Sequence, residues 1–161
     1  MRKPIFKSTL EQIVRQYVLH TEAVRRPECA ETPILAGKRI LLVEDNLINQ
    51  EIVKELLEQT GAAVDAAYNG REGADRYASM EDGYYDLILM DIQMPVMNGY
   101  EATRLIRGMN RRDAGSIPIF AMTADAFAED IAMARQAGMD RHLSKPIDAV
   151  SLMQEITRVL I

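Results

Sequence analysis

The chain has 161 residues, 48% of them apolar, and a formal net charge of -5. This length suits one domain with a short appendage, and the apolar content suffices for a sizeable core. The acidic balance and the lack of a dense Lys/Arg stripe argue against a nucleic-acid-binding surface. Cys29 is the sole cysteine, which excludes an internal disulfide.

The first 37 residues differ in character from the rest. Residues 1–21 predict a helix, because Ser8 can cap it and the apolar positions that follow keep helical spacing. Residues 22–37 predict a linker, since they carry prolines and charges without periodicity. Apolar spacing after Lys3-Pro4-Ile5 repeats that after Lys145-Pro146-Ile147. Residues 1–21 are therefore expected to be the last helix of a preceding copy of the same domain, with chance similarity as the alternative.

Between residues 38 and 161, short apolar runs alternate with amphipathic stretches, as in repeated strand–helix units of α/β domains. The third and fourth runs are almost wholly apolar, which favours a parallel sheet covered by helices on both faces. Gly61 and Gly138 stand where helix ends are expected. The predicted strands are Arg39–Glu44, Ala63–Ala67, Asp86–Asp91, Ile117–Thr123 and Arg141–Ser144. The predicted helices are Leu47–Gln59, Gly70–Met80, Gly99–Met109, Ala126–Ala137 and Ala149–Leu160.

Acidic residues end two of the predicted strands. Asp91 ends the third, before a loop with Pro95 and Gly99, and Glu44 and Asp45 end the first. Parallel strands end at the same edge, where open α/β sheets place their chemistry. Three carboxylates at such short distances repel one another unless a hard cation or a proton offsets their charge. The pattern predicts a Mg²⁺-assisted phosphoryl site.

Four segments carry a resemblance to a known family. They are Val43-Glu44-Asp45-Asn46, Met90-Asp91 with Met94-Pro95 and Asn98-Gly99, Met122-Thr123-Ala124, and Ser144-Lys145-Pro146. In this order and at strand ends, they resemble the receiver domain of two-component response regulators over residues 38–161. The resemblance implies a flavodoxin-like, doubly wound five-stranded parallel sheet of order 2-1-3-4-5, here with an N-terminal extra helix. It also implies a cis bond before Pro146.

The resemblance implies a role for each acid. Asp91 would take a phosphoryl group from a phosphohistidine, because a carboxylate can form an aspartyl-phosphate. Asp45 and Asp91 would bind Mg²⁺ directly, and Glu44 would act through a metal-bound water. The backbone carbonyl of Gln93 would complete the shell. Taken singly, these acids could equally be strand-end caps or a helix-start pair favoured by the helix dipole.

Two further residues would act on the phosphate. Lys145 would supply a second cation, and Thr123 would donate its hydroxyl and couple the charge at Asp91 to the following loop. Receivers often carry Phe or Tyr three residues before the lysine as a switch, whereas this chain has His142. Its ring is smaller, polar and titrates near neutrality. His142 is therefore a switch candidate beside Thr123, with an exposed strand-edge histidine as an equally good interpretation.

A linker in front, a candidate tandem copy before it and a last helix at the end of the chain resemble the C-terminal receiver of a hybrid sensor histidine kinase. Expected partners are the phosphohistidine domain of a kinase and a histidine phosphotransfer domain. The domain would catalyse its own phosphorylation and dephosphorylation, without the kinase modules. We expect a cytoplasmic location and no membrane contact by this segment, because it has no spanning run and no signal peptide.

Several alternatives stay open on the sequence. The same domain could be a stand-alone single-domain response regulator or a degenerate receiver used only for docking. A Mg²⁺-dependent aspartyl-phosphate phosphohydrolase needs an acid two residues after its nucleophile, where Gln93 cannot supply a proton. A dinucleotide-binding protein needs Gly-x-Gly-x-x-Gly after the first strand, which this chain lacks.

Overall fold

The computed structural model describes residues 34–124 and 127–161. The expected helix at 1–21 and most of the expected linker at 22–37 lie outside the described residues. Residues 34–37 form a turn that leads into the first strand. Within the described part of the chain, no helix has the length and apolarity needed to cross a membrane.

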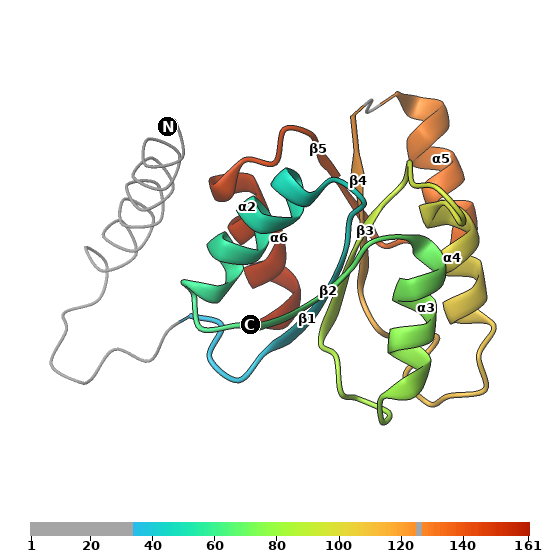
Figure 1. Ribbon diagram of the computed structural model, residues 1–161, viewed down its shortest axis with the longest axis horizontal. Coiled ribbons are helices and arrows are strands. Elements are labelled where there is room, and N and C mark those ends of the chain that lie inside the picture. Colours follow the sequence, from blue (N-terminus) through green and yellow to red (C-terminus); the bar gives the residue numbers. More distant parts are fainter. Residues whose placement is uncertain (1–33, 125–126) are drawn as a thin grey trace, which may run out of the picture.

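One parallel sheet forms the centre of the domain, with its strands in the order β2-β1-β3-β4-β5 (Figure 1). This confirms the predicted doubly wound arrangement. The order reverses between β1 and β3, so the crevice at the carboxyl ends of these two strands is the switch point where such folds bind ligands. The strands are β1 (Arg39–Val43), β2 (Ala63–Ala67), β3 (Leu87–Asp91), β4 (Ile119–Thr123) and β5 (Arg141–Ser144).

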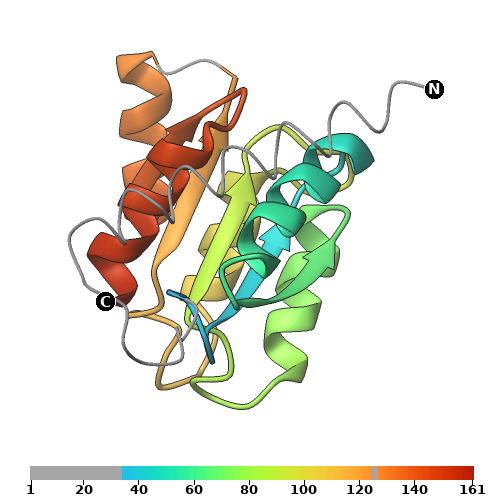
Figure 2. The same ribbon diagram turned by 90° about the vertical axis from the view of Figure 1, so that its left-hand side faces the viewer.

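In the described part of the chain, five helices cover the sheet on both faces. α2 and α6 lie on one face, and α3, α4 and α5 lie on the other (Figures 1 and 2). Asparagine or aspartate side chains cap four of them by accepting backbone N–H groups, as short polar residues do at helix starts. The helices are α2 (Leu47–Glu58), α3 (Gly70–Ser79), α4 (Gly99–Arg107), α5 (Ala128–Ala137) and α6 (Ala149–Leu160).

The core has two parts because successive strand residues point to opposite faces. In β1, Leu42 packs toward α2 and α6, whereas Leu41 packs toward α3, α4 and α5. All five residues of β3 and of β4 are buried. Both faces of the central strands must therefore be apolar, which explains why these runs show no polar alternation.

Several boundaries differ from the sequence prediction, each by one or two residues. β4 begins at Ile119 rather than Ile117, because Pro118 has no N–H to donate to a ladder. Gly61, with φ +91°, follows the last turn of α2. Its N–H donates to the carbonyl of Glu58 and the N–H of Ala62 donates to that of Leu57, so Gly61 closes the end of this helix as predicted. Gly138, with φ +107°, does cap α5. Residues 125 and 126 lie outside the described chain, and α5 begins at Ala128.

Candidate functional site

The carboxyl ends of β1 and β3 bring three acids together. Val43 pairs with Met90 in the parallel register, so the next residue of each strand, Glu44 and Asp91, comes to the same edge of the sheet. Carboxylate oxygens of Glu44, Asp45 and Asp91 all lie within 4.8 Å of one another. The convergence predicted from the strand ends is therefore present.

A lysine that follows the edge strand β5 neutralises part of this negative charge. Lys145 Nζ lies 2.9 Å from Glu44 Oε2 and 3.0 Å from Asp91 Oδ1. Lys145 follows β5, and its N–H donates to the carbonyl of Thr123 at 2.7 Å, which continues the pairing of β4 with β5. The Lys145–Pro146 peptide bond is cis, as the resemblance implied.

Burial and neighbouring charges shift the protonation of these groups. Burial raises the pKa of Asp91 to about 7, the charge of Glu44 adds to this rise, and Lys145 opposes it. Burial alone would lower the pKa of Lys145, but hydrogen bonds and charge from Glu44 and Asp91 outweigh it and raise the pKa. The ammonium therefore keeps its charge, and without a bound cation Asp91 titrates close to neutrality.

The turn after β1 directs its two acids differently. The N–H of Asn46 donates to Glu44 Oε1 at 3.1 Å, and Asn46 Oδ1 accepts from the N–H groups of Ile48 and Asn49 to cap α2. Glu44 is thereby held inward at 1% exposure, while Asp45 stays exposed. Asn46 belongs to the motif that follows the first strand, but its capping role was not predicted, although an asparagine just before an apolar helical run is a recognisable cap.

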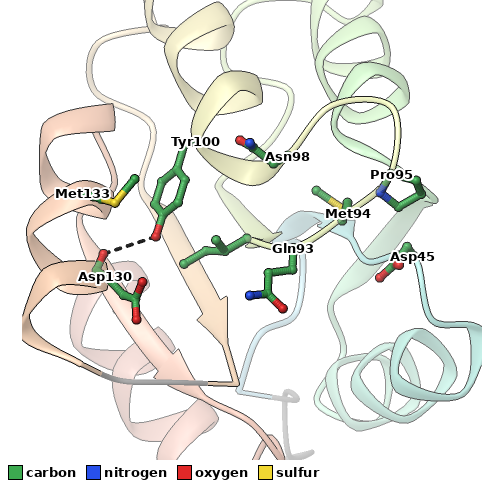
Figure 3. A pocket seen from close by; sticks show the side chains of 9 residues that line it. Asp45, Gln93, Met94, Pro95, Asn98, Tyr100, Asp130 and Met133 are labelled. Atoms are coloured by element: carbon green, nitrogen blue, oxygen red, sulfur yellow. Dashed lines mark hydrogen bonds between the residues drawn. The ribbon is translucent and has the colours of Figure 1, made fainter.

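A cavity of about 480 Å³ opens beside the acids, between the loop after β3 and helices α4 and α5 (Figure 3). Asp45 lies at one end of it, and Gln93 extends its exposed side chain into it from the loop. At the other end, Tyr100 donates to the carbonyl of Asp130 at 3.4 Å. Of the three acids, Asp45 lines this cavity, whereas Glu44 and Asp91 do not.

The two switch candidates lie in different surroundings. Thr123 is buried at the end of β4, directly after Met122, which pairs with Asp91. His142 is exposed on β5 and pairs with Ala121. Among residues 34–124 and 127–161, no hydrogen bond or ion pair joins His142 to the three acids. The structure therefore brings Thr123, but not His142, to the acidic end of the sheet.

The donor set fits a magnesium ion. Hard carboxylate oxygens are the ligands that Mg²⁺ prefers, and oxygens that share one octahedral ion lie roughly 3 to 4 Å apart. The oxygens of Glu44, Asp45 and Asp91 lie within 4.8 Å of one another, which is near this spacing. Glu44 already accepts from Asn46 and pairs with Lys145, so Asp45 and Asp91 have more free lone pairs for direct ligation.

Comparison with known proteins gives the family. Residues 40–157 match the description "Response regulator receiver domain". Similar curated proteins include Probable histidine kinase 2 of Oryza sativa subsp. indica, 39% identical over 76% of this chain, and Sensor protein GacS of Pseudomonas syringae pv. syringae, 40% identical over 74%. The match spans 13% of the length of each relative. It thus concerns one domain of much longer proteins.

Similar solved structures are receiver domains as well. The receiver domain of sensor histidine kinase PA1611 from Pseudomonas aeruginosa, with magnesium in its active-site cleft, has a TM-score of 0.69 and 37% identity over 77% of this chain and 98% of its own. The receiver domain of Ssk1, solved with the phosphotransfer protein Ypd1 of Saccharomyces cerevisiae, has a TM-score of 0.70 and 32% identity over 78% of this chain and 90% of that chain. The chain belongs to the response regulator receiver domain family, and is a phosphoacceptor module of a two-component phosphorelay.

Proposed function

We propose that Asp91 is the phosphoacceptor and that it takes its phosphoryl group from a phosphohistidine of a partner protein. A carboxylate oxygen of Asp91 attacks phosphorus, the phosphorus–nitrogen bond breaks, and the imidazole leaves with the electron pair. The observation that carries this proposal is the ammonium of Lys145 held between Glu44 and Asp91 at the end of β3. A positive group there can offset charge on the transferring phosphoryl oxygens.

We propose Mg²⁺ as the cofactor of this site. Asp45 and Asp91 would bind it directly, Glu44 through a bound water, and the backbone carbonyl of Gln93 would complete the protein ligands. When bound, the ion supplies positive charge to the phosphoryl group. The close approach of the three carboxylates supports this assignment, as does the engagement of Glu44 with Lys145.

We propose that Thr123 and Lys145 respond to phosphorylation of Asp91 by changing position. Phosphate on Asp91 adds charge beside both residues, and their movement toward it would shift the surface of the last helix–strand–helix unit, which is α5, β5 and α6. The burial of Thr123 at the end of β4 supports this role. His142 stays a candidate for a second switch residue beside Thr123, and its position in β5 is the one observation that supports this.

We propose that the parent protein is a hybrid histidine kinase and that the domain passes phosphate to, or receives it from, a histidine phosphotransfer domain in the cytoplasm. The kinases among the relatives and the Ypd1–Ssk1 complex support this context. A stand-alone regulator is the second candidate, because Vibrio cholerae chemotaxis protein CheY4 aligns over 100% of its own chain, with a TM-score of 0.71 and 27% identity. The reading frame around this segment decides between the two.

The phosphoacceptor assignment is tested by incubating the protein with acetyl phosphate or phosphoramidate and measuring intact mass. We expect Mg²⁺-dependent addition of one phosphoryl group, loss of labelling in Asp91→Asn, and loss on chelation of the metal. Asp130→Asn is the matched control, because it also removes a carboxylate beside the cavity and should leave labelling unchanged. Equal labelling of Asp91→Asn and wild type would overturn the assignment.

A further inference from the structure

Gln50 is a buried polar residue that the proposed function does not use. It lies in the first turn of α2 with 5% of its surface exposed. Its Nε2 donates two hydrogen bonds, to the carbonyl of Glu44 at 3.1 Å and to the carbonyl of Ala67 at 3.0 Å. One side-chain nitrogen therefore joins α2 to the ends of both β1 and β2.

These bonds continue the sheet beyond its last regular pair. The ladder between β1 and β2 ends at Val43 and Ala67, after which the N–H of Glu44 donates to the carbonyl of Ala67 at 3.0 Å. Gln50 binds that same carbonyl and also the carbonyl of Glu44. Both main-chain polar groups of Glu44 are therefore bonded, the N–H to β2 and the carbonyl to α2.

The orientation of this main chain decides where two carboxylates point. Glu44 and Asp45 are consecutive, and the carbonyl held by Gln50 belongs to the peptide that joins them. A rotation of that peptide would move the Asp45 side chain relative to Asp91, although Gln50 touches neither carboxylate. Groups that orient ligands in this way typically change metal affinity about 10- to 100-fold.

We propose that Gln50 is a positioning residue of the metal site, which raises the affinity for Mg²⁺ by holding the Glu44–Asp45 peptide. This inference rests on the proposed Mg²⁺ site. Glutamine suits the position because its amide offers two donors, whereas an ionised glutamate offers none. Methionine would fill the same space but leave two buried carbonyls without this donor. Asparagine keeps the amide and is one methylene shorter.

The test distinguishes an effect of Gln50 on Mg²⁺ affinity from an effect on the stability of the fold alone. Mg²⁺ binding to the unphosphorylated chain is measured by calorimetry, and stability without metal by urea unfolding. Leu56→Ala is the control, because Leu56 is a buried core residue further along the same helix, 2% exposed. We expect Gln50→Met to weaken Mg²⁺ binding about 10-fold or more. Leu56→Ala should lower stability while leaving the dissociation constant unchanged.

Gln50→Asn gives the same comparison if Gln50→Met does not fold. A dissociation constant in the folded Gln50 variant equal to that of wild type would overturn the inference and leave the proposed cofactor standing. Equal weakening by Leu56→Ala would also overturn it, since affinity would then follow stability. A wild-type chain that binds no Mg²⁺ would overturn the proposed cofactor, and this inference with it.

Discussion

The main-chain carbonyl of Asp91 lies against the α-carbon of Gly99. A β-carbon on Gly99 would collide with that carbonyl oxygen and come within 2.9 Å of the α-carbon of Ile92. The N–H of Gly99 also donates to the carbonyl of Ile92 at 2.9 Å. The first residue of α4 is therefore packed on the last residue of β3, and the intervening loop returns to the proposed phosphoacceptor.

Gly99→Ala should displace the Asp91 main chain, because the colliding atoms are backbone and cannot turn away. We expect a loss of about 1 to 3 kcal/mol in the free energy of unfolding, together with slower labelling by acetyl phosphate. Urea unfolding and intact-mass kinetics measure the two effects. Gly115→Ala is the control, because a β-carbon there meets nothing within 4 Å. Normal labelling of Gly99→Ala would contradict the expected displacement.

Lys145→Met removes the ammonium while keeping most of the side-chain volume. Glu44 and Asp91 then lie buried without their shared counter-charge, so the metal-free protein should lose about 3 kcal/mol or more of stability. Added Mg²⁺ should stabilise this variant more than wild type, because the ion replaces the lost positive charge. Thermal unfolding with and without Mg²⁺ checks both statements.

Lys54→Met is the matched control for the lysine substitution. Lys54 pairs with Glu58 at 3.9 Å, and both side chains are more than 40% exposed. Such surface pairs contribute about 1 kcal/mol at most. A loss of stability as large as that of Lys145→Met would show that removing any lysine, rather than the buried counter-charge, causes the effect.

Asp113 should make stability depend on pH at the end of the sheet opposite the acids. Burial alone would raise its pKa, but hydrogen bonds from Arg111, at 3.1 Å, and from the N–H of Gly83, at 2.9 Å, outweigh burial and lower the pKa. A lowered pKa in the folded state stabilises the protein above the unfolded value of about 3.9. That contribution is lost as the pH falls through the lower, folded-state pKa.

We therefore expect Asp113→Asn to cost about 2 kcal/mol at pH 7, and the difference from wild type to shrink as the pH falls below about 4. Urea unfolding across this range measures it. Asp75→Asn is the control, since its pair with Arg71 is exposed on α3 and should contribute little at any pH. A constant difference across the range would show that the charge of Asp113 does not matter.

Val96 should carry backbone strain in the loop between β3 and α4. Its φ is +68°, and the N–H of Met97 donates to the carbonyl of Pro95 across it at 2.7 Å, a three-residue turn. A β-branched side chain is unfavourable in this region, whereas asparagine adopts it readily. Its side chain is 82% exposed and gives up little packing. Val96→Asn should raise stability by about 1 kcal/mol; an unchanged or lower melting temperature would contradict this.

The residue pattern alone determined that the sheet is parallel and that the acids lie at the carboxyl ends of its strands. Apolar runs such as Leu87–Met90 are too short and too uniformly apolar for anything but buried strands of an α/β domain. Parallel strands end at one edge, so acids placed after two of them had to meet if the strands were neighbours. The order of the strands came from the resemblance carried by the four motifs, and the structure confirms it.

The tertiary structure decided what depends on side-chain direction and on the packing of distant segments. The pairing of Lys145 with both Glu44 and Asp91 requires β5 to lie beside β4 with a particular register. The two bonds of Gln50 and the close approach of Gly99 to Asp91 have no signature in hydrophobic periodicity. Periodicity reports which face of an element is buried, whereas these contacts are set by ångström-scale distances between elements that only the packed fold brings together.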